Sequence, residues 1–174
     1  MTQADAIGFF QKTYDVHADS VYRFCLLRAR APEDAQDIVQ DTFVKFWDYI
    51  ARGDEVENPK AFIFQITRNL IIDHYRKQGH REGSLEVLME DGFDEKDARA
   101  ENQIEHSAEI ELLKKHLKTL DPLYQEAVYL RHFEECSVGE IAQILGESEN
   151  VISVRIHRGI AKLRERINKD DHGT

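Results

Sequence analysis

Apolar side chains recur at helical spacing along almost the whole chain, and no stretch alternates apolar and polar residues as a half-buried strand would. The stripe that follows Pro32 shows the pattern well, with successive members one, three or four residues apart: Ala35, Ile38, Val39, Thr42, Phe43, Phe46 and Ile50. Such spacing places its members on one face of an α-helix. The later segment AFIFQITRNLIIDHY is apolar on almost every side, which indicates a buried helix. These patterns predict an all-α protein.

A change of composition divides the chain into two small helical domains. Residues 81–106 contain nine acidic side chains, two glycines and few regularly spaced apolar residues. Such a segment buries too little apolar surface to offset the entropy of ordering it. We therefore expect a helical bundle over residues 1–80, an acidic linker over 81–106, a four-helix domain over 107–170 and a tail over 171–174. An independently folded element in place of the linker is the less favoured alternative.

The second domain contains a segment with helix-turn-helix spacing, SVGEIAQILGESENVISVRIHRG. Ser137 and Glu140 have the spacing of a capping box, Gly146 suits the turn, and Ser148 is placed to cap the last helix. A helix-turn-helix unit sets its second helix in the major groove of DNA. The side chains expected to face outward there are Asn150, Ser153, Val154, His157 and Arg158, with Arg155 at the side. A hairpin that binds only protein is the alternative, and the basic residues that follow favour DNA.

The formal charge of −10 does not exclude DNA binding, because the charge is unevenly spread. Residues 59–81 contain five basic and one acidic side chain, and residues 150–169 contain six and one. Local patches decide where a polyanion docks, since salt screens charges beyond about 10 Å.

Several classes of protein are disfavoured by the sequence. No run approaches the roughly 18 apolar residues of a membrane span, and the N-terminus has no export signal. Cys25 and Cys136 are more typical of two buried, reduced thiols than of a disulfide framework. His132 and Cys136 are four residues apart but lack further metal ligands nearby. We expect a cytoplasmic protein without membrane insertion, catalytic site, metal or cofactor.

Two segments carry a family resemblance. DAQDIVQDTFVKFW, from Asp34 to Trp47, resembles a signature of the extracytoplasmic-function (ECF) group of bacterial sigma factors, and PKAFIFQITRNLIIDHY is similar to the helix that follows it there. Residues 120–167 resemble region 4 of the same family. The resemblance implies a region 2-like bundle and a region 4-like helix-turn-helix domain. It implies a transcription initiation factor that binds RNA polymerase core, promoter DNA and an anti-sigma factor.

The resemblance also assigns surfaces to residues. Core polymerase would be bound by Asp34, Asp37, Gln40, Asp41, Lys45 and Trp47. The minus-10 element would be bound by Lys60, Arg68, Asn69, Asp73, Arg76 and Lys77, with base selection by the acidic loop that holds Asp54, Glu55 and Glu57. The minus-35 element would be bound by Ser148, Asn150, Ser153, Val154, Arg155, His157, Arg158 and Lys162.

The recognition helix departs from the family at three positions, which are commonly Thr, Lys or Arg, and Ser but here are Val151, Ser153 and Val154. We expect altered specificity rather than lost DNA binding. Two other functions stay open: a helix-turn-helix regulator that acts without core polymerase, and a helical adaptor or decoy that no longer reads DNA.

Overall fold

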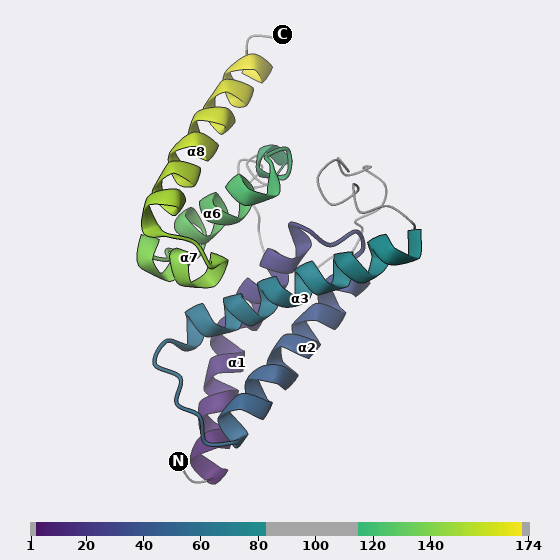
Figure 1. Cartoon of the computed structure of the whole chain (residues 1–174), viewed down its shortest axis with the longest axis vertical. Coiled ribbons are helices and arrows are strands. Elements are labelled where there is room, and N and C mark those ends of the chain that lie inside the picture. The colour runs from purple at the N-terminus through teal and green to yellow at the C-terminus, as the bar shows by residue number, and fades with distance from the viewer. Residues whose placement is uncertain (1–2, 83–114, 172–174) are drawn as a thin grey trace. The chain divides into compact units, whose positions relative to one another are not determined.

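The computed structural model describes residues 3–82 and 115–171, and every regular element in these ranges is a helix (Figure 1). This confirms the all-α, two-domain prediction. The chain divides into two compact units, residues 1–88 and 89–174. Almost all of the expected acidic linker and of the tail lies outside the described residues; only residues 81, 82 and 171 are helical ends.

The first unit consists of three helices that pack on one another: α1 (Gln3–Leu26), α2 (Pro32–Ala51) and α3 (Pro59–Glu82). Pro32 occupies the first turn of α2, where its missing N–H leaves no carbonyl unpaired. Asn58 caps α3, since its Oδ1 accepts a hydrogen bond from the Ala61 N–H at 3.0 Å. Both helices thus begin at a proline and a local start signal.

Large apolar side chains from all three helices fill the core of this unit. The largest fully buried ones are Phe24, Phe46, Phe64, Ile50, Ile63 and Ile71. Phe24 and Phe64 meet edge to face with their ring centroids 5.3 Å apart, which joins α1 to α3. Two buried hydroxyls are satisfied locally: Thr42 donates to the Ile38 carbonyl at 2.7 Å and Thr67 to the Ile63 carbonyl at 2.8 Å.

The second unit is described as a helical stretch at residues 115–118 followed by α6 (Pro122–His132), α7 (Val138–Leu145) and α8 (Glu149–Asp171). The capping box at the start of α7 is confirmed: Ser137 Oγ accepts from the Glu140 N–H at 3.1 Å, and Glu140 Oε2 accepts from the Ser137 N–H at 2.7 Å. Gly146 ends α7 with a φ of 66°, a conformation that favours glycine. The Val151 N–H donates to Ser148 Oγ at 3.3 Å, so Ser148 caps α8 as expected.

Helices α6 and α8 pack closely, because α8 has a glycine at the contact. A Cβ atom added to Gly159 would lie 2.6 Å from Cγ2 of Val128 on α6. Asp121 stands at the N-cap of α6, but its side chain makes no capping hydrogen bond; Oδ2 accepts from Lys162 Nζ of α8 at 3.0 Å. Lys162 also lies over the Tyr124 ring, 4.6 Å from its centroid. The Asp121 carboxylate thus connects α6 to α8.

No helix within the described ranges has the length and apolarity that crossing a membrane requires.

Candidate functional site

The outward side of α2 brings together three of the six residues expected to bind a partner. Asp37, Gln40 and Asp41 are exposed on one side of the helix. Val44 lies next to them on the same side of the helix, and its exposed fraction is 58%. Together with exposed Asp48 one turn further on, these residues form what we call the acidic face: Asp37, Gln40, Asp41, Val44 and Asp48. An apolar side chain flanked by three carboxylates and an amide suits a basic protein surface with an apolar contact at its centre.

The other three residues of that set lie elsewhere on α2. Asp34 is partly buried, and its Oδ1 is 3.5 Å from Nε2 of His74 on α3. The Trp47 ring packs edge-on against Phe10 of α1 at 5.5 Å. Lys45 is exposed and lines a hollow of about 210 Å³ with Asp48, Tyr49 and Arg52. The sequence did not single out Val44, because helical spacing shows only that this position faces solvent.

Three of the six expected minus-10 residues share the solvent side of α3. Asn69, Asp73 and Arg76 follow the spacing i, i+4, i+7, which puts them on one face. Arg76 donates to Asp73 Oδ1 at 3.0 Å, so this arginine is partly neutralised by its neighbour. Lys77, the next residue, is exposed. The face offers amide, carboxylate and guanidinium groups in one row.

Lys60 and Arg68 are partly buried and do not join this row. Lys60 lies near His17 of α1: burial lowers the pKa of that imidazole, and the positive charge of Lys60 lowers it further. The loop between α2 and α3 exposes all three of its acids, Asp54, Glu55 and Glu57.

Helix α8 exposes a row of side chains beginning at its first turn. Asn150, Ser153, Val154, His157 and Arg158 are all exposed, as helical spacing predicts. Ser148 is exposed too, but its hydroxyl accepts the capping hydrogen bond. The outward row therefore combines one amide, one hydroxyl, one apolar side chain, one imidazole and one guanidinium.

Two cations expected to bind DNA are held by carboxylates of their own unit. Arg155 Nη2 donates to Glu147 Oε1 at 2.6 Å, and the arginine side chain is only 14% exposed. Lys162 is bound to Asp121, as described above. Sequence reasoning missed both pairs because the partners are eight and 41 residues apart along the chain.

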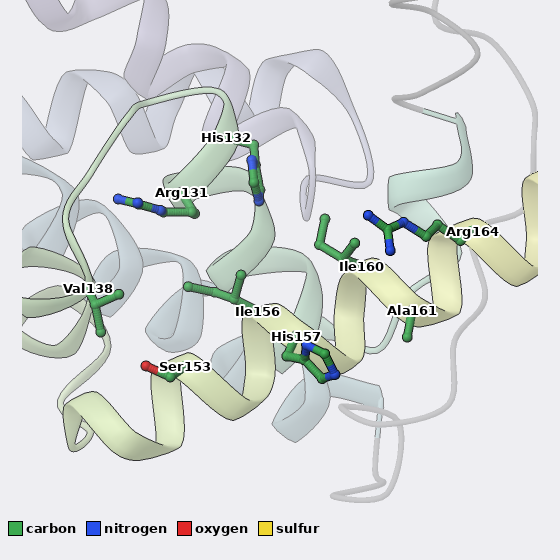
Figure 2. Close-up of a pocket in the computed structure, with 9 residues that line it drawn as sticks. All are labelled: Arg131, His132, Val138, Ser153, Ile156, His157, Ile160, Ala161 and Arg164. Atoms are coloured by element: carbon green, nitrogen blue, oxygen red, sulfur yellow. The ribbon is translucent and has the colours of Figure 1, made fainter.

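A hollow of about 410 Å³ lies beside the recognition helix. Figure 2 shows its lining from the end of α6, the start of α7 and one side of α8: Arg131, His132, Val138, Ser153, Ile156, His157, Ile160, Ala161 and Arg164. No carboxylate is among these nine residues, although the chain is acidic overall. Arg131 is held in place, since Nη1 donates to the Cys136 carbonyl at 2.9 Å.

Arg131, His132 and Arg164 were absent from the expected site because they lie outside the recognition segment. In the sequence, His132 stands out only as a metal ligand spaced four residues from Cys136. Cys136 is buried, and its thiol contacts the Glu134 carbonyl at 3.8 Å, whereas His132 lines the hollow. Cys25 is also a buried free thiol, and burial raises its pKa to about 12. Residues 3–82 and 115–171 contain no group of three or more His, Cys, Asp or Glu placed to hold a metal ion.

Both units match known sequence families. Sigma-70 region 2 matches residues 13–81, and Sigma-70, region 4 matches residues 110–163. The ECF RNA polymerase sigma factor BldN of Streptomyces coelicolor is 30% identical over 172 residues, covering 97% of this chain and 62% of BldN. The RNA polymerase sigma-E factor of Streptomyces antibioticus is 31% identical over 143 residues, covering 80% of this chain and 74% of that protein. The chain thus spans about three fifths of the length of BldN.

A solved structure has the same fold. The sigma factor RpoE from Bartonella quintana, crystallised with the anti-sigma factor NepR, superposes with a TM-score of 0.76 at 26% identity. The match covers 92% of this chain and 98% of RpoE.

Proposed function

Because this chain belongs to the extracytoplasmic-function family of sigma factors, we propose that it binds RNA polymerase core and directs it to promoters. One observation carries the proposal: a single chain holds both a region 2 and a region 4 match, and each unit exposes a face suited to its partner. Neither unit alone would support it, since helix-turn-helix units serve many regulators that never bind polymerase.

The acidic face of α2 is the surface proposed for core polymerase. Its carboxylates favour encounter with a basic partner and set the register, whereas a buried apolar contact slows dissociation. Val44 is placed to make that contact, because it is the apolar member of the face and is exposed. Asp34 and Trp47 act indirectly in this proposal: through His74 and Phe10 they hold α2 against α3 and α1.

The outer row of α3 is the surface proposed for the minus-10 element. Asn69 offers a donor and an acceptor to an unstacked base, and Arg76 and Lys77 bind flanking phosphates. Unpairing a base costs a few kcal/mol, which its capture by stacking and hydrogen bonds offsets. The acidic loop before α3 repels phosphate but accepts hydrogen bonds from exocyclic amines, so it suits base selection.

Helix α8 is the surface proposed for the minus-35 element, with base contacts from Asn150, Val154, His157 and Arg158. The hollow beside it adds two guanidinium groups and an imidazole along which one DNA strand can pass: Arg131 and His132 on α6 and Arg164 on α8. Contacts of this kind position the helix without reading sequence.

The chain would act in the cytoplasm and without catalytic activity of its own, since the polymerase supplies the chemistry. An anti-sigma protein is the proposed regulator, because RpoE, which shares this fold, was crystallised with one. Such a partner would compete with polymerase by covering the acidic face.

Run-off transcription with purified bacterial core polymerase tests the proposal. Core and the full chain are incubated with a pool of randomised promoters, and selected transcripts are expected only when both proteins are present. Val44→Glu is expected to abolish them by placing a charge at the centre of the contact. Val16→Glu is the matched control, because Val16 is 61% exposed on α1 of the same unit.

The outcomes separate this proposal from its rivals. DNA selection without any binding to core would support a regulator that acts alone. Binding to core without sequence selection would support an adaptor or decoy. An equal loss of transcripts with Val16→Glu and Val44→Glu would contradict a specific role of α2 in binding core polymerase.

A further inference from the structure

Two valines face outward at the start of the recognition helix. Val151 is 37% exposed and Val154 is 45% exposed, and they are three residues apart on α8. A lone exposed valine needs no explanation. Here, however, both lie on the helix proposed to enter the major groove, between the exposed polar side chains of Asn150 and Arg158.

Two polar groups of the first turns, those of Arg155 and Ser148, are engaged within the unit, whereas Asn150, His157 and Arg158 are exposed and can read other base pairs. Arg155, which lies between Val154 and Arg158 in the sequence, is bound to Glu147 and mostly buried. The Ser148 hydroxyl caps the helix, and Ser153 lines the hollow next to Val138 (Figure 2). Arg155 is the one basic residue between Ser148 and Ile156, so this part of the helix presents no unpaired cation.

Apolar contacts in the major groove read one base. Thymine carries a methyl group at C5, and no other standard base presents an apolar group there. Residues three apart on a helix are separated by about 4.5 Å along its axis, close to the roughly 3.4 Å between neighbouring base pairs. Val151 and Val154 can thus meet methyl groups on adjacent base pairs.

We propose that Val151 and Val154 make this chain select thymines at two adjacent base pairs of its minus-35 element. This deepens the proposed function and rests on it for the docking of α8. The Glu147–Arg155 ion pair contributes to this selection, because it holds a guanidinium that would otherwise bind any nearby phosphate or guanine. At these two base pairs, discrimination then depends on contact with the methyl groups, whereas Asn150, His157 and Arg158 read other positions.

Replacement of thymine by uracil tests this directly, because it removes the methyl group and leaves base pairing and phosphates unchanged. Duplexes enriched from a randomised upstream element are measured with the full chain, alone and assembled with core polymerase. We expect adjacent thymines, and an affinity loss of about four-fold for each uracil, from the burial of one methyl group.

The variants Val151→Ala and Val154→Ala should each become insensitive to uracil at one of the two positions and stay sensitive at the other. Leu123→Ala is the control, since Leu123 is 43% exposed on α6 of the same unit and should leave both uracil effects intact. Glu147→Gln should raise affinity for all duplexes and reduce the preference for thymine.

Uracil effects of equal size in the wild type and both alanine variants would overturn the inference, as would enrichment without adjacent thymines. The outcome is distinguishable from failure of the proposed function. Uracil-sensitive binding without transcripts from core would refute the sigma activity alone, whereas transcripts from promoters insensitive to uracil would refute the thymine reading alone. Absence of DNA binding both with and without core would refute both.

Discussion

At the scale of single residues, Lys60 and His17 offer a test of the charge at the expected minus-10 surface. Burial lowers the pKa of His17 below its ordinary value of 6.5, and Lys60 lowers it further by charge repulsion. Lys60→Gln should therefore raise the His17 pKa towards that value, as followed by NMR titration of the imidazole. Lys77→Gln removes a cation from the same helix and should leave His17 unchanged. An equal shift in both variants would contradict a specific Lys60 effect.

The same histidine gives the first unit a pH dependence of defined sign. Because the His17 pKa is lower in the folded state, the unfolded chain binds more protons just below pH 6.5. Its contribution to the free energy of unfolding should decrease as the pH falls through 6.5 and level off once the folded state is also protonated. His17→Gln should remove this part of the slope, measured by urea unfolding followed through Trp47 fluorescence. A slope unchanged by the substitution would contradict the assignment.

Gly159 is the residue on which the α6–α8 contact most depends. Gly159→Ala gains helix propensity worth up to about 1 kcal/mol. Against this, its Cβ would lie 2.6 Å from a methyl group of Val128, which is buried and β-branched and cannot turn aside. Overpacking of this kind costs about 1–3 kcal/mol, so we expect net destabilisation of about 1–2 kcal/mol. Hydrogen exchange of the α6 and α8 amides measures it within this unit.

Gly139→Ala is the matched control for Gly159→Ala. Its added Cβ would approach Glu149 Oε1 only to 3.5 Å, an ordinary contact, so α7 should become slightly more stable. Val128→Ala combined with Gly159→Ala should be less destabilising than the sum of the single changes, because the deleted methyl makes room. Strict additivity would show that the close approach is not the cause.

At the scale of elements, α8 carries one cation that is exposed to DNA and one that is paired within the unit, and a salt titration distinguishes their roles. Arg158 is exposed on the outward row, whereas Lys162 binds Asp121 and lies over Tyr124. Arg158→Gln should reduce by about one the slope of log affinity against log salt for promoter DNA. Lys162→Gln removes the same charge one turn away, yet should change that slope less and weaken the α6–α8 contact by at most about 1 kcal/mol. Equal slopes for both variants would show that Lys162 also binds phosphate.

The elements themselves were largely predictable from the sequence, because their signals are local. The capping box of Ser137 and Glu140, the Gly146 turn and the Asn58 cap act within four residues. The site was less predictable, because its chemistry depends on side chains paired across the fold. Asp34 faces His74, and Arg155 faces Glu147, and neither pair follows from spacing on one helix. Val44 was missed since the helical pattern distinguishes buried from exposed positions but not one exposed residue from another.

At the scale of the whole molecule, the charge of −10 causes the chain to repel DNA except at the two basic stretches, residues 59–81 and 150–169. Two weak contacts joined in one assembly bind far more tightly than either alone, because the second forms at high effective concentration. We therefore expect the full chain alone to bind promoter duplex weakly near 150 mM salt, about 100-fold or more below its complex with core polymerase, as measured by gel retardation.

Lower salt should narrow that gap between the free chain and the complex, because electrostatic attraction at α8 and α3 then acts with less screening. A chain that binds promoters equally well with and without core would not need the acidic face of α2 for DNA selection. That result would favour the regulator that acts alone. A gap that persists at every salt concentration would instead mean that core polymerase supplies DNA contacts in addition to joining those of the two units.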